Sequence, residues 1–170
     1  MPELDLYDPA EPDPEALEDE ARACEDAARA VPGVTNSQGA SSSYSSSQWR
    51  LATSGGFNGL HRASGFSLSA ATIAGEGAAM ERGGDHRSVR WREDLPGAEV
   101  IGTEAGNRAV QRLGARKIDS ITAPVIFENR LASSLIGPLI GAISGAAVAR
   151  GVSFLKDRLG QQLFAKGVDL

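Results

Sequence analysis

The sequence predicts an α+β fold: an N-terminal amphipathic helix, an antiparallel β-meander, and then two helices around a short strand. Three observations carry this prediction. Apolar residues recur every three or four positions over 13–31, alternate with polar residues over 34–91, and return to helical spacing over 94–114 and 131–149. We therefore divide the chain into an acidic lead-in and helix (1–33), the meander (34–93) and a helix–strand–helix region (94–170). This last region includes a glycine-rich helix over 129–149 that we expect to be buried.

The first helix has a clear beginning and end. Prolines interrupt residues 8–14, so that no helix forms before Pro14, and Asp13 stands at the N-cap position. Pro32 and Gly33 end the helix. Its apolar stripe consists of Leu17, Ala21, Cys24, Ala28 and Val31. We expect a helix at about 13–31 with this stripe packed inward.

The middle segment alternates with a period of two. One face of the first strand holds Trp49, Leu51 and Thr53, and a later strand places on one face Phe66, Leu68, Ala70, Thr72 and Ala74. Val89 and Trp91 continue the alternation, and the breaks between strands contain glycine, which is typical of an antiparallel meander. The serine-rich run 41–47 is either a flexible linker or a strand. Because it leads without proline into Gln48 and Trp49, we favour a strand with a solvated face.

The last third combines helical and extended patterns. Apolar residues spaced four apart predict a helix that ends at Gly114, and the apolar segment 124–127 predicts a short strand. Residues 131–149 carry no charge and place glycine at 137, 141 and 145, so that a membrane span has to be weighed. Pro138 and three serines oppose a span and favour a buried helix whose glycine edge could receive a partner subunit. The last twenty residues predict one amphipathic turn and a strand at the end.

Composition and charge exclude several classes of protein. The 170 residues are 41% hydrophobic and 23% charged, as in ordinary globular proteins, but only 5% are aromatic and 20 are glycine, which predicts closely packed backbones. Residues 1–30 hold eleven acids against two arginines, a net charge of −9, while the rest carries +4. This argues against nucleic-acid binding by the first segment. A single cysteine and the lack of a secretory leader predict a cytoplasmic protein.

The residues alone reveal no catalytic machinery. His61 and His86 lack metal-ligand spacing, and we interpret each as a surface histidine. Ser67 lacks the second glycine of a nucleophile elbow. Four arginines lie near Trp91 in the sequence: Arg82, Arg87, Arg90 and Arg92. The alternation of side chains along the strand and the acidic residues nearby favour a solvated sheet face over a phosphate-binding site. These patterns indicate a binding or assembly module.

Several short segments, taken in order, resemble the TldD/PmbA family, also called modulators of DNA gyrase. They are Thr35-Asn36-Ser37 with Gly39, Leu51-Ala52-Thr53-Ser54 with Gly56-Phe57 and Gly59, Met80-Glu81-Arg82, Pro124-Val125-Ile126-Phe127, Gly141-Ala142-Ile143-Ser144-Gly145, and Ser153-Phe154-Leu155-Lys156-Asp157 with Leu159-Gly160. Family members are longer at both ends, so the chain resembles the middle segment of such a protein.

The resemblance implies a zinc peptidase assembled from two related subunits, in which the TldD-type subunit carries a helical HExxxH motif. Counted from Pro124, the motif positions fall on Gly137, Pro138 and Ala142, none of which can bind metal or act as a base. The chain therefore resembles the non-catalytic, PmbA-type subunit: it holds no cofactor, its TldD-type partner holds the zinc, and the complex takes unfolded peptides. Expected contacts with peptide or partner are Ser43, Ser45, Ser47, Gly141 and Gly145, with strand addition as the mode.

Two other functions stay open on the sequence. One is an interaction protein that modulates DNA gyrase, and the other is an enzyme that uses His61 or His86 in an unrecognised site. We expect no membrane association and no direct contact with nucleic acid. An apolar face normally covered by the rest of such a protein would favour self-association of this chain.

Overall fold

The computed structural model describes residues 4–167, which fall into two compact units that divide between Lys117 and Ile118. The first unit contains α1 (Pro14–Arg29), β1 (Val34–Ala52), β2 (Asn58–Ala74), β3 (Glu81–Val89) and α2 (Ala98–Val110). Single 3-10 turns at Gly77–Ala79 and Arg92–Asp94 flank β3. The division lies later than the sequence analysis placed it, because α2 packs on α1 and on the sheet rather than with the helices that follow.

Helix α1 forms as its caps and apolar stripe predict. The Asp13 carboxylate accepts a hydrogen bond from the Ala16 amide at 2.7 Å, which satisfies one of the free donors of the first turn. Cys24 and Ala28 are fully buried, whereas Glu18 and Arg22 form an exposed i,i+4 pair at 2.6 Å. The helix thus contributes its small-residue stripe to the core.

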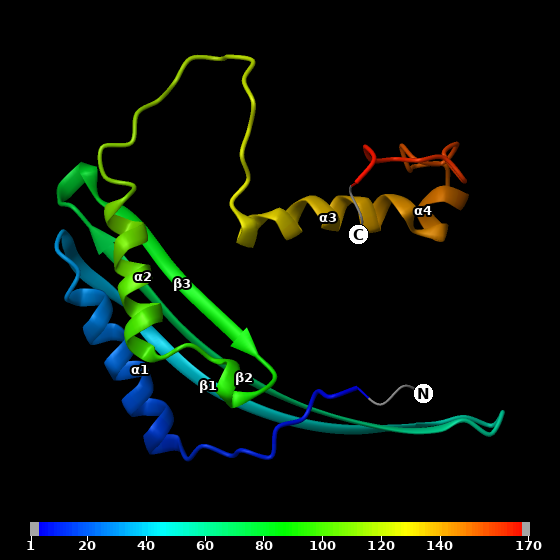
Figure 1. Cartoon of the computed structure of the whole chain (residues 1–170), viewed down its shortest axis with the longest axis horizontal. Coiled ribbons are helices and arrows are strands. Elements are labelled where there is room, and N and C mark those ends of the chain that lie inside the picture. Colours follow the sequence, from blue (N-terminus) through cyan, green and yellow to red (C-terminus); the bar gives the residue numbers. More distant parts are fainter. Residues whose placement is uncertain (1–3, 168–170) are drawn as a thin grey trace. The chain divides into compact units, whose positions relative to one another are not determined.

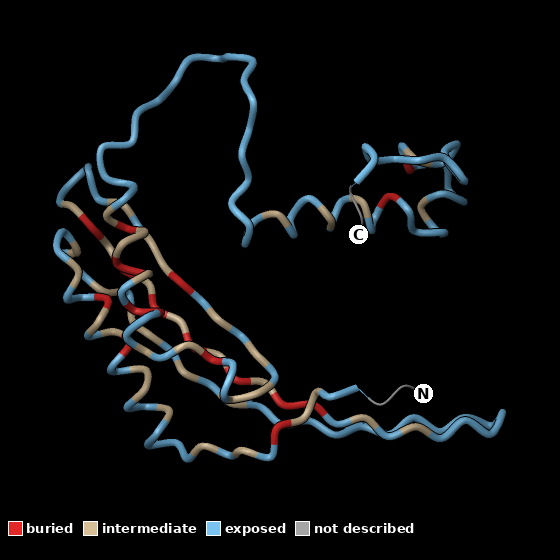
Figure 2. The backbone as a smooth tube through the Cα atoms, viewed as in Figure 1, coloured by how far each residue is buried: buried red, intermediate tan, exposed pale blue. Residues whose placement is uncertain are grey.

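The sheet is the predicted antiparallel meander, with the strand order β1-β2-β3. The serine-rich run belongs to β1, where Ser43 pairs with Ser67 and Tyr44 pairs with Phe66 of β2. Both helices lie over one face of the sheet (Figure 1). Buried positions concentrate beneath them (Figure 2), and the alternating set predicted from the sequence is buried in full: Phe66, Leu68, Ala70, Thr72 and Ala74.

Glycine allows α2 to approach its neighbours closely. A Cβ added at Gly102 would lie 2.1 Å from the Cys24 carbonyl oxygen of α1, and one at Gly106 would lie 2.7 Å from the Ala28 carbonyl oxygen. On the other side, a Cβ at Gly83 of β3 would lie 2.1 Å from the Ala109 amide nitrogen. The high glycine content therefore serves backbone contact in this unit.

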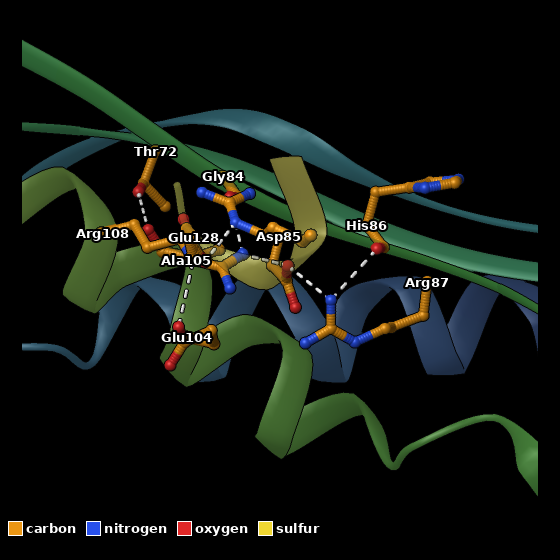
Figure 3. A network of polar contacts seen from close by, with 10 residues as sticks. Thr72, Gly84, Asp85, His86, Arg87, Glu104, Ala105, Arg108 and Glu128 are labelled. Carbon is orange, nitrogen blue, oxygen red and sulfur yellow. Dashed lines mark hydrogen bonds and ion pairs between the residues drawn. The ribbon is translucent and has the colours of Figure 1, made fainter. Parts of the chain in front are cut away.

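A buried polar network fastens α2 to β3 (Figure 3). The side chain of Asp85 is 1% exposed and forms ion pairs with Arg87, at 3.0 Å, and with Arg108 of α2. Arg108 also donates to the Gly84 carbonyl at 3.3 Å, and the Thr72 hydroxyl donates to the Ala105 carbonyl at 3.2 Å. These contacts fix the register between α2 and the sheet.

The second unit contains α3 (Asn129–Ile143) and α4 (Gly145–Ala149). The helix predicted over 129–149 is interrupted at Ser144, whose extended backbone (φ −57°, ψ 126°) ends α3. The expected burial is wrong within this chain: Leu131, Leu135, Ile140 and Ile143 are each more than half exposed, because within the described part of this unit no element covers them. Of the α3 residues, only Ala142 is buried.

Two further predictions for this region are corrected. The apolar segment 124–127 forms neither a helix nor a strand, since a strand needs a partner and no described strand pairs with this segment. Residues 151–167 form turns rather than a strand, and residues 168–170 lie outside the described range. Within the described range, no helix combines the length and apolarity that crossing a bilayer requires.

Candidate functional site

A largely exposed feature of the first unit is the end of the β1–β2 hairpin, residues 48–62, which we call the arm. Strand β3 ends where Val89 pairs with Phe66, so the arm continues as a two-stranded ribbon that reaches past the helices (Figure 1). Four large apolar side chains on it are 45–51% exposed: Trp49, Leu51, Phe57 and Leu60. Exposed apolar groups on a projecting ribbon are typical of a contact surface.

The serines predicted as contact residues line the sheet face that the helices leave open. Because Tyr44 and Ser42 face the helices, alternation places Ser43, Ser45 and Ser47 on the opposite face, and all three are exposed. The Ser43 hydroxyl lies 2.8 Å from the Ser67 hydroxyl, and Ser47 donates to the Ala63 carbonyl at 3.3 Å. Farther along, the Trp49 ring packs on His61 with centroids 5.2 Å apart. The open face is thus a strip of hydroxyls that ends in an aromatic pair.

The backbone of β1 presents unpaired groups along its outer edge. The Thr53 amide donates to the Phe57 carbonyl across the hairpin at 2.9 Å, which sets the alternation of the ladder. From Ala40 to Ala52, beyond the register shifts at the start of β1, odd-numbered residues therefore pair toward β2, and the even-numbered residues Tyr44, Ser46, Gln48 and Arg50 direct their N–H and C=O groups outward. Within residues 4–167 no strand pairs with these groups, which we call the β1 edge (Tyr44–Arg50).

The hairpin is basic although the chain as a whole is acidic. No Asp or Glu occurs between Asp26 and Glu76, whereas Arg50 and Arg62 both lie on the arm. The Arg62 guanidinium stacks on the Tyr7 ring, 3.9 Å from its centroid. Gln48, Trp49, Arg50 and Leu60 line a shallow hollow of about 380 Å³. An acidic or aromatic group fits this environment best.

The positions that the resemblance assigned to the zinc motif lie on α3. A Cβ added at Gly137, Gly141 or Gly145 would have nothing within 4 Å, so that this glycine edge is open in the second unit. Pro138 lies inside the helix, and the Ala142 carbonyl accepts a hydrogen bond from Ser153 at 2.6 Å. None of these residues has a side chain that could bind a metal ion or move a proton.

The other candidate groups are placed as follows. His86 is exposed and Arg87 pairs with Asp85, while Arg92 forms an ion pair with Glu20 at 2.6 Å. The arginines near Trp91 are thus partly occupied by acidic partners and do not form one anion site. Among residues 4–167, no three His, Cys, Asp or Glu side chains are grouped so as to hold a metal ion.

The single thiol is not positioned as a nucleophile. Burial raises the pKa of Cys24 to about 11, and the negative charges of Glu20 and Asp85 act in the same direction. Cys24 is fully buried between α1 and its neighbours, so it stays protonated at neutral pH and serves packing.

Sequence reasoning identified the serine strip but missed the arm and its arginines. The signal was present as the stretch of 49 residues, 27–75, without an acidic residue. The docking of the N-terminal segment was missed as well: the Leu6 carbonyl accepts from the Ser64 amide at 2.9 Å, although 58 positions separate the two residues. Such a long-range contact leaves no periodic pattern in the sequence.

Comparison with family models divides the chain at the boundary seen in the structure. Residues 7–113 match the PmbA/TldA metallopeptidase central domain, and residues 120–170 match the PmbA/TldA metallopeptidase C-terminal domain. The first match corresponds to the unit that ends at Lys117, and the second to the unit that begins at Ile118.

Curated relatives match over almost the whole chain. Metalloprotease PmbA of Escherichia coli O157:H7 is 39% identical over 166 residues, which are 95% of this chain and 36% of that protein. The Metalloprotease PmbA homolog of Haemophilus influenzae is 32% identical over 163 residues, which are again 95% of this chain and 36% of the relative. A solved structure, of a candidate DNA gyrase modulator from Thermotoga maritima, has a TM-score of 0.86 at 24% identity and covers 95% of this chain and 38% of that one. The chain therefore spans about 36% of the length of these curated relatives and has the same fold as the solved structure.

Proposed function

The chain belongs to the PmbA/TldD metallopeptidase family, and from this premise we propose that it forms part of a non-catalytic, PmbA-type subunit of a cytoplasmic zinc peptidase. In this proposal a TldD-type subunit holds the zinc ion and the general base. The present chain pairs with that subunit and helps to bind unfolded peptides for cleavage. No chemical step is assigned to residues of this chain.

One observation carries the proposal: the residues of α3 at the motif positions. Zinc peptidases of this kind need two imidazole ligands and a carboxylate on one helix. In this chain the two histidine positions are Gly137 and Ala142, and the glutamate position is Pro138. Their side chains are a hydrogen atom, a methyl group and a pyrrolidine ring, respectively. The open glycine edge of α3 and the exposed apolar residues beside it support a role in subunit contact, because small residues let another backbone approach closely.

The open strip and the β1 edge support the peptide-binding part of the proposal. Unpaired backbone donors and acceptors bind any extended peptide irrespective of its side chains, as a protein that handles unfolded substrates requires. The exposed serines add small hydrogen-bonding groups without obstructing access.

The proposal is tested by following the cleavage of casein, an unfolded protein. The full-length protein that contains this chain is incubated alone, then with its HExxxH-bearing relative, and each reaction is repeated with a chelator. Cleavage that needs both proteins and stops on chelation supports the proposal. Chelator-sensitive cleavage by this protein alone contradicts it. Absence of cleavage together with capture of DNA gyrase would favour the interaction-protein alternative.

A further inference from the structure

The two edges of the β1–β2 hairpin differ in one respect: next to the arm, the N-terminal segment contacts the β2 edge at Ser64, whereas no described strand pairs with the β1 edge. On the β2 side, Ser64 directs its amide away from β1 and donates it to the Leu6 carbonyl at 2.9 Å. Ser64 also accepts a hydrogen bond from the Asp8 amide on its hydroxyl, at 2.9 Å. Leu6 and Asp8 thus each form a hydrogen-bonded contact with Ser64, just beyond the point where β3 ends, without forming a strand.

One side chain of that segment contacts the arm, and other groups of the segment contact residues that follow β3. Tyr7 lies under the guanidinium of Arg62, 3.9 Å away, and the Asp5 carbonyl accepts from the Trp91 indole at 3.4 Å. Asp8 is buried and accepts from the Arg92 amide at 2.6 Å. Tyr7 is thus the side chain of this segment that contacts an arm arginine, whereas the Asp8 carboxylate is bound by backbone amides, one of them that of Arg92 after β3.

The β1 edge has matching groups. Even-numbered Arg50 lies on the same face of the arm as even-numbered Arg62, because alternate residues of paired strands share a face. Beside Arg50 lies the hollow formed with Gln48, Trp49 and Leu60. Edge strands usually carry charges or proline that prevent pairing, yet residues 44–49 contain neither.

We propose that the β1 edge, Tyr44–Arg50, binds an extended acidic peptide segment by strand addition, with an aromatic or carboxylate side chain at Arg50 in the hollow beside Trp49. That the peptide comes from an unfolded substrate chain rests on the proposed function. The outward amides of Tyr44, Ser46, Gln48 and Arg50 supply affinity independent of sequence, and Arg50 supplies the preference for acidic segments.

The test measures binding by the whole chain, without any partner subunit. The probe is a fluorescein-labelled peptide with the sequence of residues 4–10, Leu-Asp-Leu-Tyr-Asp-Pro-Ala, and its anisotropy is followed on titration. Two control peptides have the same length: one with Asp5→Asn and Asp8→Asn, and one with N-methyl groups on alternate amides. We expect each control to bind about tenfold more weakly, since one loses the charge and the other the backbone donors.

Two variants of the chain locate the site. Arg50→Ala should weaken binding about tenfold, whereas Arg116→Ala, which removes an equal charge from an exposed position, should not. Ser46→Pro removes an outward donor without touching the β1–β2 ladder and should abolish strand addition. Hydrogen exchange supplies an independent readout: bound peptide should protect the amides of Tyr44, Ser46 and Gln48, while Ser45 and Ser47 are protected already.

The proposal is overturned if Arg50→Ala and Ser46→Pro both bind like the unaltered chain, or if protection appears on β3 instead. It is also overturned if sedimentation shows a dimer that Ser46→Pro dissociates, because a second copy would then occupy the β1 edge. Binding needs no catalytic partner, so failure of casein cleavage with retained peptide binding would count against the proposed function and not against this site.

Discussion

The close packing of α1 on α2 makes Gly102 the position most sensitive to a single added carbon. In Gly102→Ala the new Cβ would lie 2.1 Å from the Cys24 carbonyl oxygen and 3.0 Å from both the Ala28 amide nitrogen and the Ala27 Cβ. Backbone atoms cannot rotate away, so the helices have to separate by about 1 Å to restore van der Waals distance. Overpacking of this kind costs about 1–3 kcal/mol.

The helix propensity of alanine offsets part of this cost, by about 0.5–1 kcal/mol. Because backbone is opposed to backbone, we expect the net loss to be about 2 kcal/mol, which lowers Tm by roughly 8 °C in a domain of this size. Thermal unfolding followed by tryptophan fluorescence reports this unit alone, since Trp49 and Trp91 both precede Lys117.

Two controls isolate the effect of contact. Thr103→Ala changes the next residue of the same helix at an exposed position and should leave Tm equal or higher. Gly141→Ala makes the same substitution in α3, where nothing lies within 4 Å, and should increase helicity in circular dichroism. If Gly102→Ala unfolds at the temperature of the unaltered chain or above it, close contact between α1 and α2 does not limit this position.

Three further outcomes follow from the first unit. Asp85→Ala removes a carboxylate that is 1% exposed and paired with two arginines, so urea unfolding should show a loss of about 3 kcal/mol; a loss below about 1 kcal/mol would contradict the role given to the network. Asp13→Ala removes the N-cap acceptor of α1 and should cost about 1 kcal/mol, whereas Asp19→Ala, within the same helix, should cost less. The pKa of Cys24 is raised from 9.0 to about 11, so folding favours the thiol, and this stabilisation is complete below pH 9 and lost as the pH rises toward 11. Between pH 9 and 11 the free energy of unfolding should therefore fall more for the unaltered chain than for Cys24→Ala. An equal fall in both proteins would show that ionisation of Cys24 does not affect stability.

Local patterns predicted the parts of the fold in which each element is stabilised by its own sequence. The N-cap, the alternating strand residues and the four-residue spacing in α2 all correspond to the elements that form. The prediction for residues 129–149 was wrong because burial depends on what packs against a helix, and its glycines at 137, 141 and 145 meet nothing within 4 Å. The glycines that do pack, Gly102 and Gly106, have the same spacing of four but are opposed by α1.

The candidate site was predictable only in part, for a similar reason. Serine alternation indicated a solvated strand, and Ser43, Ser45 and Ser47 lie on the open face as expected. The free backbone groups of the β1 edge depend on strand order, and the docking of residues 4–8 depends on where β3 ends. Both are properties of the assembled sheet and not of any one segment.

The proposal that this chain supplies no catalytic group can be examined in the two-subunit mixture. The glutamate of the partner's HExxxH motif is replaced by glutamine while the protein containing this chain is left unaltered, and casein cleavage is measured with and without a chelator. We expect that cleavage is abolished, and that His86→Ala in this chain, with the partner intact, leaves the rate unchanged. Chelator-sensitive cleavage that persists without the partner's glutamate would contradict the proposal.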